Sequence, residues 1–243
     1  MRKIGVGILS HNNPVLIDEF YAHLRPRIDK SVDFVVFDNG SDKDKIAKCT
    51  THGISTNKFF TMGLNRMLLI LRQYDYIWLC VNNFKVKTDG DPVMSMLLKC
   101  EMDGEIGIIH PSVIPITSKY DYPKMIHTSI SKGYTRDHIV TDLVCMFFTK
   151  KALDANDWCF DSRFMYGWGL NYDICHEVRQ KGLRIAVDFD VAVEIDKYSR
   201  YENFEDKGFR DKHAYYETAL KSMYEVMIKK YGKNWRKLFN IQS

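Results

Sequence analysis

Two short apolar segments near the N-terminus, each ending abruptly in small polar residues, constrain the fold of this chain most strongly. Residues 4–9 lead into Ser10 and Asn12, and residues 33–37 lead into Asp38. A segment with helical spacing lies between them, so the pattern predicts a strand–helix–strand unit of a parallel sheet. The polar residues are then expected together at the carboxyl edge of the sheet, where open α/β folds bind ligands.

Further along the chain, apolar spacing and turn signals predict more elements of an α/β fold. The expected elements are helices over 15–25, 62–73 and 91–99 and strands over 76–81 and 107–110. From residue 199 the chain becomes polar and aromatic and then basic, with apolar residues at three- and four-residue steps. We therefore expect a main domain over 1–198 and a helical, basic extension over 199–243 that packs on it.

Composition narrows the class of protein. The 243 residues, 45% of them apolar, suit one α/β domain with a sizeable core. No apolar stretch reaches the roughly 18 residues of a membrane span, and the first apolar run is too short for a signal peptide. We therefore expect a soluble, cytoplasmic protein, or one in the host cytoplasm if the chain is viral. The six cysteines are scattered without a Cys-x-x-Cys pair, as in reduced proteins, and the net charge of +4 permits contact with phosphates.

Three stretches resemble the GT-A glycosyltransferases, in particular the inverting family two of these enzymes. Asp38 matches the Asp that ends the second strand in the family and holds the donor nucleotide. Residues 57–66 resemble the family stretch Asn-x-Gly-Phe-x-x-Gly-x-Asn-Arg, although Phe59 replaces the usual Gly. Residues 164–182 resemble the acceptor-side motif, which is an aromatic Gly-Trp-Gly turn, acidic residues and a helix that ends in Gly.

The resemblance implies a GT-A type, nucleotide-sugar-binding α/β sheet that is mostly parallel and has helices on both faces. It implies an acceptor side that includes Trp168 and Gly169, because an indole offers a flat apolar face to a sugar ring. The donor-side residues that it implies are Ser10, Asn12, Asp38, Asn57, Asn65, Arg66, Asn82 and Asn83.

Purely structural explanations stay open for several of these residues. Asn39-Gly40 also suits a tight turn with positive φ. Asn57 also suits a helix cap, and Gly63 suits close packing of the helix that follows. The basic C-terminal segment also suits a solvated helix face.

The family uses a divalent cation, Mn²⁺ or Mg²⁺, to neutralise the departing nucleoside diphosphate. The family's ligands come from an Asp-x-Asp or Asn-x-Asp after the strand that matches 76–81. In this chain the strand runs into Asn82, Asn83 and Phe84, so an apolar ring stands in place of the second acid. A strong cation site formed by the two amides alone is therefore not expected.

Other carboxylates offer a substitute for the missing metal ligand. Asp89 and Asp91 form a literal Asp-x-Asp, and Asp196 lies near the place of a later His ligand of the family. Asp91 also precedes Pro92 at a predicted helix start, where Asp is favoured as a cap. Both explanations of Asp91 remain open from the sequence.

The catalytic base of the family is also altered. Alignment of the Gly-Trp-Gly turn places Leu170 and Asn171 where the family has Glu-Asp. The amide of Asn171 cannot accept a proton at neutral pH, so Asp173 becomes the candidate base. Its structural alternative is a first-turn acid stabilised by the helix dipole.

Two functions follow from these observations. The first is a glycosyltransferase, inverting by resemblance, that moves a hexosyl or pentosyl group from a nucleoside-diphosphate sugar to a hydroxyl of a glycan or of a hydroxymethylated base in phage-type DNA. The second is a non-catalytic relative that binds a nucleotide sugar or a glycan as a scaffold or partner. A methyltransferase is disfavoured because no Gly-x-Gly-x-Gly turn follows the first strand.

Overall fold

The protein is described by a computed structural model over residues 2–81, 84–115, 122–195 and 208–241. The strands are β1 (Ile4–Ser10), β2 (Asp33–Asn39), β3 (His52–Ile54), β4 (Tyr76–Cys80), β5 (Phe84–Val86), β6 (Ile106–Pro115), β7 (Tyr134–Thr135), β8 (Phe147–Thr149) and β9 (Arg184–Ile195). The α-helices are α1 (Pro14–Leu24), α2 (Phe59–Leu71), α3 (Pro92–Met102), α4 (Lys150–Ala155), α5 (Leu170–Gln180), α6 (Lys212–Tyr231) and α7 (Trp235–Leu238). Short 3-10 turns are η1 (Arg25–Arg27), η2 (Lys43–Lys45), η3 (Pro123–Met125) and η4 (Leu143–Cys145).

One sheet organises the fold, in the order β3-β2-β1-β4-β8-β6-β9-β5, with β7 paired to β9. The prediction of parallel strands holds for the first four, since β1 pairs in parallel with β2 and β4, and β2 with β3. Beyond β4 the sheet is mixed, because β8 runs antiparallel to both β4 and β6. Ser10 is the register partner of Asp38, so the ends of β1 and β2 lie side by side at one edge.

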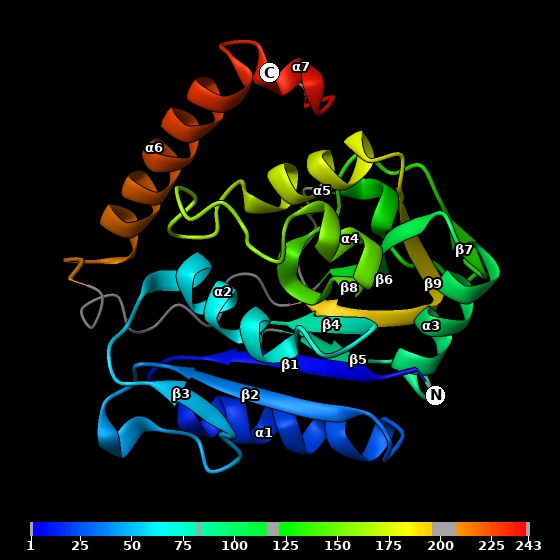
Figure 1. The fold of residues 1–243 in the computed structure, drawn as a ribbon, viewed down its shortest axis with the longest axis horizontal. Coiled ribbons are helices and arrows are strands. Elements are labelled where there is room, and N and C mark those ends of the chain that lie inside the picture. The colour runs from blue at the N-terminus through cyan, green and yellow to red at the C-terminus, as the bar shows by residue number, and fades with distance from the viewer. Residues whose placement is uncertain (1, 82–83, 116–121, 196–207, 242–243) are drawn as a thin grey trace.

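Helices cover both faces of the sheet, as predicted (Figure 1). On one face, side chains of α1 and α3 form a core with alternate residues of the strands. On the other face, α2, α4, α5 and α6 share a second core. Gly5 and Gly7 of β1 allow α2 to approach closely, since a Cβ at Gly7 would come within 2.8 Å of the Leu71 side chain. The absence of side chains at these two positions of β1 therefore sets the depth at which α2 packs.

The predicted elements are present, with shifted boundaries. The strand expected over 107–110 extends over Ile106–Pro115, and the helix expected over 62–73 begins earlier, at Phe59. Asn13 precedes α1 but makes no capping hydrogen bond through its side chain. The short strand β8 and helix α4 were not expected, because their few residues carry no clear periodicity.

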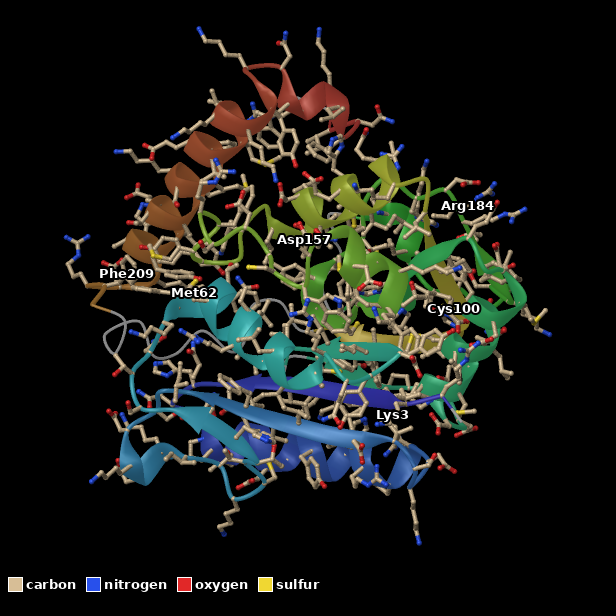
Figure 2. All side chains as sticks on the ribbon, in the orientation of Figure 1. Lys3, Met62, Cys100, Asp157, Arg184 and Phe209 are labelled. Atoms are coloured by element: carbon tan, nitrogen blue, oxygen red, sulfur yellow. The ribbon has the colours of Figure 1, made fainter. Side chains whose placement is uncertain are left out.

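The C-terminal segment forms the predicted helix, α6, followed by the short α7. The ribbon leaves a gap between α6 and the body of the protein, but side chains fill it (Figures 1 and 2). Met223 and Met227 of α6 belong to the same core as Leu170 and Ile174 of α5. The domain division at residue 198 stays a prediction, because residues 196–207 lie outside the described part of the chain. Among the described helices, none is both long enough and apolar enough to cross a membrane.

Candidate active site at the carboxyl edge of the sheet

Asp38 is the second-to-last residue of β2 and is only 3% exposed. One of its oxygens accepts a hydrogen bond from the Ser41 backbone N–H at 2.9 Å, and the other accepts one from the Ser41 hydroxyl at 2.5 Å. Gly40, with φ +74°, turns the chain between the two residues, which agrees with the turn expected from the sequence. Each carboxylate oxygen can accept a further hydrogen bond. The turn therefore fixes the carboxylate and leaves part of its hydrogen-bonding capacity available.

Asn57 joins the segments that follow β1 and β2. Its Oδ1 accepts hydrogen bonds from Asn39 Nδ2 at 3.2 Å and from the Phe59 backbone N–H at 2.7 Å, and its Nδ2 lies 2.9 Å from His11 Nε2. Both ends of this amide are therefore engaged within the protein. Its contacts suit a residue that positions the loops of the edge, and a donor contact by Asn57 stays a prediction.

Ser10 and Asn12 lie at the end of β1, next to Asp38. The Ser10 hydroxyl is buried and has no hydrogen-bond partner among the described residues. Asn12 adopts φ +49°, its backbone N–H donates to Ser41 Oγ at 2.8 Å, and its side chain exchanges hydrogen bonds with Asp42. Buried polar atoms are ordinarily paired, so the Ser10 hydroxyl still has hydrogen-bonding capacity at this edge.

Phe59, which stands where the motif resembled in the sequence has Gly, adopts a backbone conformation that favours glycine. Its φ is +61°, a conformation that glycine adopts readily and that is strained for a bulky residue. Two contacts hold it there: its backbone N–H donates to Asn57, and its carbonyl oxygen accepts from Asn39 Nδ2 at 3.0 Å. Gly63 packs against the Asn39 side chain, since a Cβ at Gly63 would come within 2.7 Å of the Asn39 amide nitrogen. The glycine of the motif therefore has a packing role.

Asn65 and Arg66, predicted on the donor side, are not drawn into this cluster. Asn65 exchanges two hydrogen bonds of 2.8 Å with the backbone of Phe160 and so fastens α2 to the segment after α4. Arg66 lies exposed on α2. A contact of either residue with a donor stays a prediction.

Of the candidate metal ligands, the structure describes only Asp89 and Asp91. Asn82, Asn83 and Asp196 are outside the described residues. Phe84 begins β5 as a core residue, with its ring 4.9 Å from that of Phe20 and 5.7 Å from that of Trp78. The ring of Phe84 is therefore part of the hydrophobic core.

The Asp-x-Asp stretch lies at the opposite edge of the sheet from Asp38, where the parallel strands begin. β5 runs antiparallel to β9 and so returns the chain to the amino side. There Asp91 caps α3 by accepting from Val93 and Met94 N–H, and its other oxygen accepts from Asp29 N–H at 2.7 Å. Asp89 is exposed. In the described residues, no three His, Cys, Asp or Glu side chains converge in a way that suits a metal ion.

The Gly-Trp-Gly turn at the start of α5 is tightly enclosed. Gly167 and Gly169 have φ of +81° and +79°. A Cβ at Gly167 would come within 2.4 Å of the Phe60 ring, and one at Gly169 within 2.7 Å of Met223. Trp168 is half-buried and meets Tyr216 of α6 edge-on, with 5.1 Å between ring centroids. The turn is therefore wedged between α2 and α6, and sugar binding by Trp168 and Gly169 stays a prediction.

Asn171 and Asp173 face different surroundings, because residues two apart on a helix do not face each other. Asn171 is buried, and its Nδ2 donates to the Tyr122 hydroxyl at 2.7 Å and to the Thr141 carbonyl at 2.8 Å. Beside this group lies the buried Asp142, which was not among the residues predicted from the sequence. The signal that was available is its position directly before the apolar run 143–148.

Asp173 turns toward α6. Its Oδ1 accepts from the Tyr231 hydroxyl at 2.6 Å and lies 2.5 Å from Lys230 Nζ, which also meets Glu177 at 3.2 Å. Burial raises the pKa of Asp173, against the opposing pull of Lys230 and Tyr231. The carboxylate is only 4% exposed, so its desolvation outweighs the attraction of the ammonium, which is itself 23% exposed. These contacts tie α5 to α6, and a role for Asp173 as base stays a prediction.

Comparison with known proteins identifies the fold. Neither the known protein-family models nor the curated proteins contain a match to this chain. A crystal structure of GalNAc-T7 with UDP, GalNAc and Mn²⁺ matches with a TM-score of 0.65 at 10% sequence identity. The match covers 100% of this chain and 55% of that one, so this chain spans about half the length of the protein it resembles. The α/β sheet, the helices on both faces and the C-terminal helix are those of a GT-A-like fold.

Proposed function

We propose that this protein transfers a sugar from a nucleoside-diphosphate sugar to a hydroxyl acceptor, with inversion at the anomeric carbon. The observation that carries the proposal is the buried edge formed by Asp38 and the unpartnered Ser10 hydroxyl. These groups end adjacent parallel strands, where α/β folds bind nucleotides. The GT-A-like fold and the UDP bound in the structural neighbour support a nucleotide at the same edge.

In this proposal Asp38 accepts hydrogen bonds from the base or ribose of the donor, and Ser10 pairs with a polar group of the nucleotide. A carboxylate suits this task because hydrogen bonds to a charged group stabilise by about 1.5–3 kcal/mol each. Asn57 and Asn39 hold the surrounding loops in place through their mutual bond and their contacts with His11 and Phe59. The donor then meets a preformed edge, which lowers the entropy lost on binding.

The leaving group of this reaction carries the charge of a diphosphate, and the neighbouring structure contains Mn²⁺. The described residues of this chain do not gather into a metal centre, and Phe84 fills the place of the family acid. We therefore propose weak or unusual dependence on a divalent cation. Of the predicted metal ligands Asp89, Asp91 and Asp196, Asp91 is engaged in capping α3. A bound cation would contribute neutralisation of the departing diphosphate.

The acceptor is proposed to be a glycan or a hydroxymethylated base in DNA. Residues 208–241 carry eight Lys and Arg against three Asp and Glu, so the basic character of the chain is concentrated around α6 and α7. A surface of this sign suits an acceptor with phosphate groups. A neutral glycan acceptor needs no such surface, so the salt dependence of transfer distinguishes the two.

The test is a thermal-shift and donor-hydrolysis screen over nucleotide sugars, with Mn²⁺ and with chelator, followed by an acceptor screen that includes hydroxymethylated DNA. We expect one nucleotide class to raise the melting temperature and its sugar to be released or transferred. Full dependence on micromolar Mn²⁺ would contradict the proposed metal behaviour. Absence of both binding and turnover for every donor would contradict the proposed function.

A non-catalytic relative that binds nucleotide sugars is the second candidate. The observation that favours it is the amide of Asn171 at the family's base position, with Asp173 engaged by Lys230 and Tyr231. Binding of a nucleotide sugar without hydrolysis or transfer to any acceptor is the result expected of this alternative.

A further inference from the structure

At the position of the family's catalytic base, this chain has a residue that cannot accept a proton. Asn171 stands in that position, and its amide nitrogen donates both of its hydrogens to Tyr122 and Thr141. Asp173, the next acid along α5, is directed toward Lys230 and Tyr231. An inverting transfer still needs a group that takes the proton from the acceptor hydroxyl.

Asp142 lies at the same edge of the sheet as Asp38 and Ser10. β8 runs antiparallel to β4, and the pairing continues past the strand ends, since Val81 N–H donates to the Val144 carbonyl at 2.7 Å. Residues that precede Val144 therefore lie beyond the carboxyl end of β4. Three strand spacings separate β2 from β8 through β1 and β4, which is about 14 Å. A donor whose nucleotide lies at Asp38 and which extends along this edge would point its other end toward Asp142.

The surroundings of Asp142 connect it to the acceptor side. The residue is 8% exposed, so it is largely enclosed. The preceding residue, Thr141, accepts the hydrogen bond of Asn171 through its carbonyl. Burial, reinforced by the nearby Asp142 charge, raises the pKa of Tyr122, whose hydroxyl also binds Asn171. Asp142 thus shares one polar cluster with the residue at the family's base position.

We propose that Asp142 is the catalytic base of this protein, an inference that rests on the proposed glycosyl transfer. The acceptor oxygen attacks the anomeric carbon while its proton passes to the Asp142 carboxylate. The bond from the anomeric carbon to the diphosphate oxygen breaks, and the nucleoside diphosphate leaves with the bonding electrons. Asp142 then returns the proton to water. Asn171 and Tyr122 hold the loop that carries the carboxylate.

The test compares Asp142→Asn and Asp142→Ala with wild-type protein in turnover, donor affinity and melting temperature. Loss of a positioned base is expected to lower kcat by about a hundredfold to ten-thousandfold, with donor affinity changed by less than about twofold. Glu225→Gln is the matched control, because it removes an exposed carboxylate of α6 by the same chemical change. It is expected to retain wild-type turnover.

Chemical rescue separates a base from a residue that only supports the fold. Azide is already an anion and attacks the anomeric carbon without giving up a proton. In Asp142→Ala, added azide is therefore expected to restore donor consumption and to yield the inverted glycosyl azide, detected by mass spectrometry. A structural defect would not be repaired in this way.

Three results would overturn the assignment. Wild-type turnover in Asp142→Asn would exclude Asp142 as the base while leaving the proposed function intact. Equal loss of turnover and donor affinity, with no rescue by azide, would show that Asp142 acts only on the fold. A wild-type protein that neither hydrolyses nor transfers any donor would remove the proposed function and this inference together.

Discussion

The two sides of the candidate site use their motif residues differently. At the ends of β1 and β2, Asp38 and Ser10 are buried at the carboxyl edge, and their neighbours hold them in place. At the start of α5, Asp173 and Trp168 are engaged by α6. The donor side therefore has polar atoms that suit a ligand. On the acceptor side, Asp173 and Trp168 contact α6 instead.

This difference shows that a matched motif does not carry the same chemistry everywhere in a chain. On the donor side, Phe59 holds a positive φ, a conformation that glycine adopts readily. The acceptor-side motif keeps its glycine turn, but the carboxylate nearest to the family's position forms an ion pair with Lys230. Variants on each side should therefore affect different properties of the protein.

The largest expected effect is that of Gly40→Ala on the donor side. A Cβ there would come within 2.2 Å of the Asn57 backbone nitrogen, and the residue has φ +74°. We expect a loss of about 3 kcal/mol or more in the free energy of unfolding, measured by urea titration, together with loss of donor binding. Gly133→Ala is the control, because Gly133 has φ +70° and nothing within 4 Å. It should cost about 1 kcal/mol, and equal losses in the two variants would show that the turn is not tightly packed.

On the acceptor side, Lys230→Met should lower stability by about 2–3 kcal/mol, because it leaves the buried Asp173 carboxylate without its cation. Donor affinity should stay at its wild-type value. Lys150→Met removes an exposed pair with Asp154 and should cost about 0.5 kcal/mol or less. Chemical unfolding and calorimetry on the same samples measure both properties. A lower donor affinity in Lys230→Met would show that the donor side and the acceptor side are coupled.

Phe59 offers a finer test of the donor-side loop. Glycine relieves the strain of φ +61°, whereas alanine retains it, and both remove the edge-on contact with Tyr166 at 5.8 Å. We expect Phe59→Gly to be more stable than Phe59→Ala by about 1 kcal/mol, the reverse of their order in an ordinary helix. Thermal melts of the two variants make the comparison. If Phe59→Ala is the more stable variant, as it would be in an ordinary helix, the backbone at this position is not strained.

The smallest expected effect is an acid-sensitive contribution from His176, which packs between α5 and the C-terminal segment with its ring 5.1 Å from that of Tyr231. Burial lowers the pKa of His176 below its ordinary value of 6.5. A folded-state pKa below the unfolded value means that this stability is present above pH 6.5 and is lost as the pH falls through the folded-state pKa. His176→Phe should flatten this part of the stability profile between pH 7.5 and 5. An unchanged profile would exclude His176 as its source.

Local sequence patterns predicted the elements that carry strong signals of their own. The polar ends of β1 and β2 and the spacing of Met223 and Met227 were sufficient to predict that these strand ends lie together and that a C-terminal helix packs on the domain. The burial of Phe84 agrees with a core residue in place of the family acid.

The positions of Asp142 and Asp173 could not be predicted from local sequence patterns, because they depend on contacts between distant segments. Asp142 reaches the edge only because the short β8 pairs antiparallel with β4, and three residues carry too little periodicity to predict that pairing. The orientation of Asp173 depends on Lys230, which lies 57 positions further along the chain. No pattern within α5 alone indicates which of its faces meets another helix.

The measurement that tests the central claim most directly is calorimetric titration of nucleoside diphosphates and nucleotide sugars into wild-type, Asp38→Asn and Asp33→Asn proteins. Asp33 begins the same strand at the opposite edge, where it accepts a hydrogen bond from the Tyr74 hydroxyl at 3.0 Å. We expect donor binding to wild type and Asp33→Asn alike, and binding weakened by about 1.5–3 kcal/mol in Asp38→Asn. Unchanged donor affinity in a folded Asp38→Asn protein would contradict a nucleotide site at this edge of the sheet.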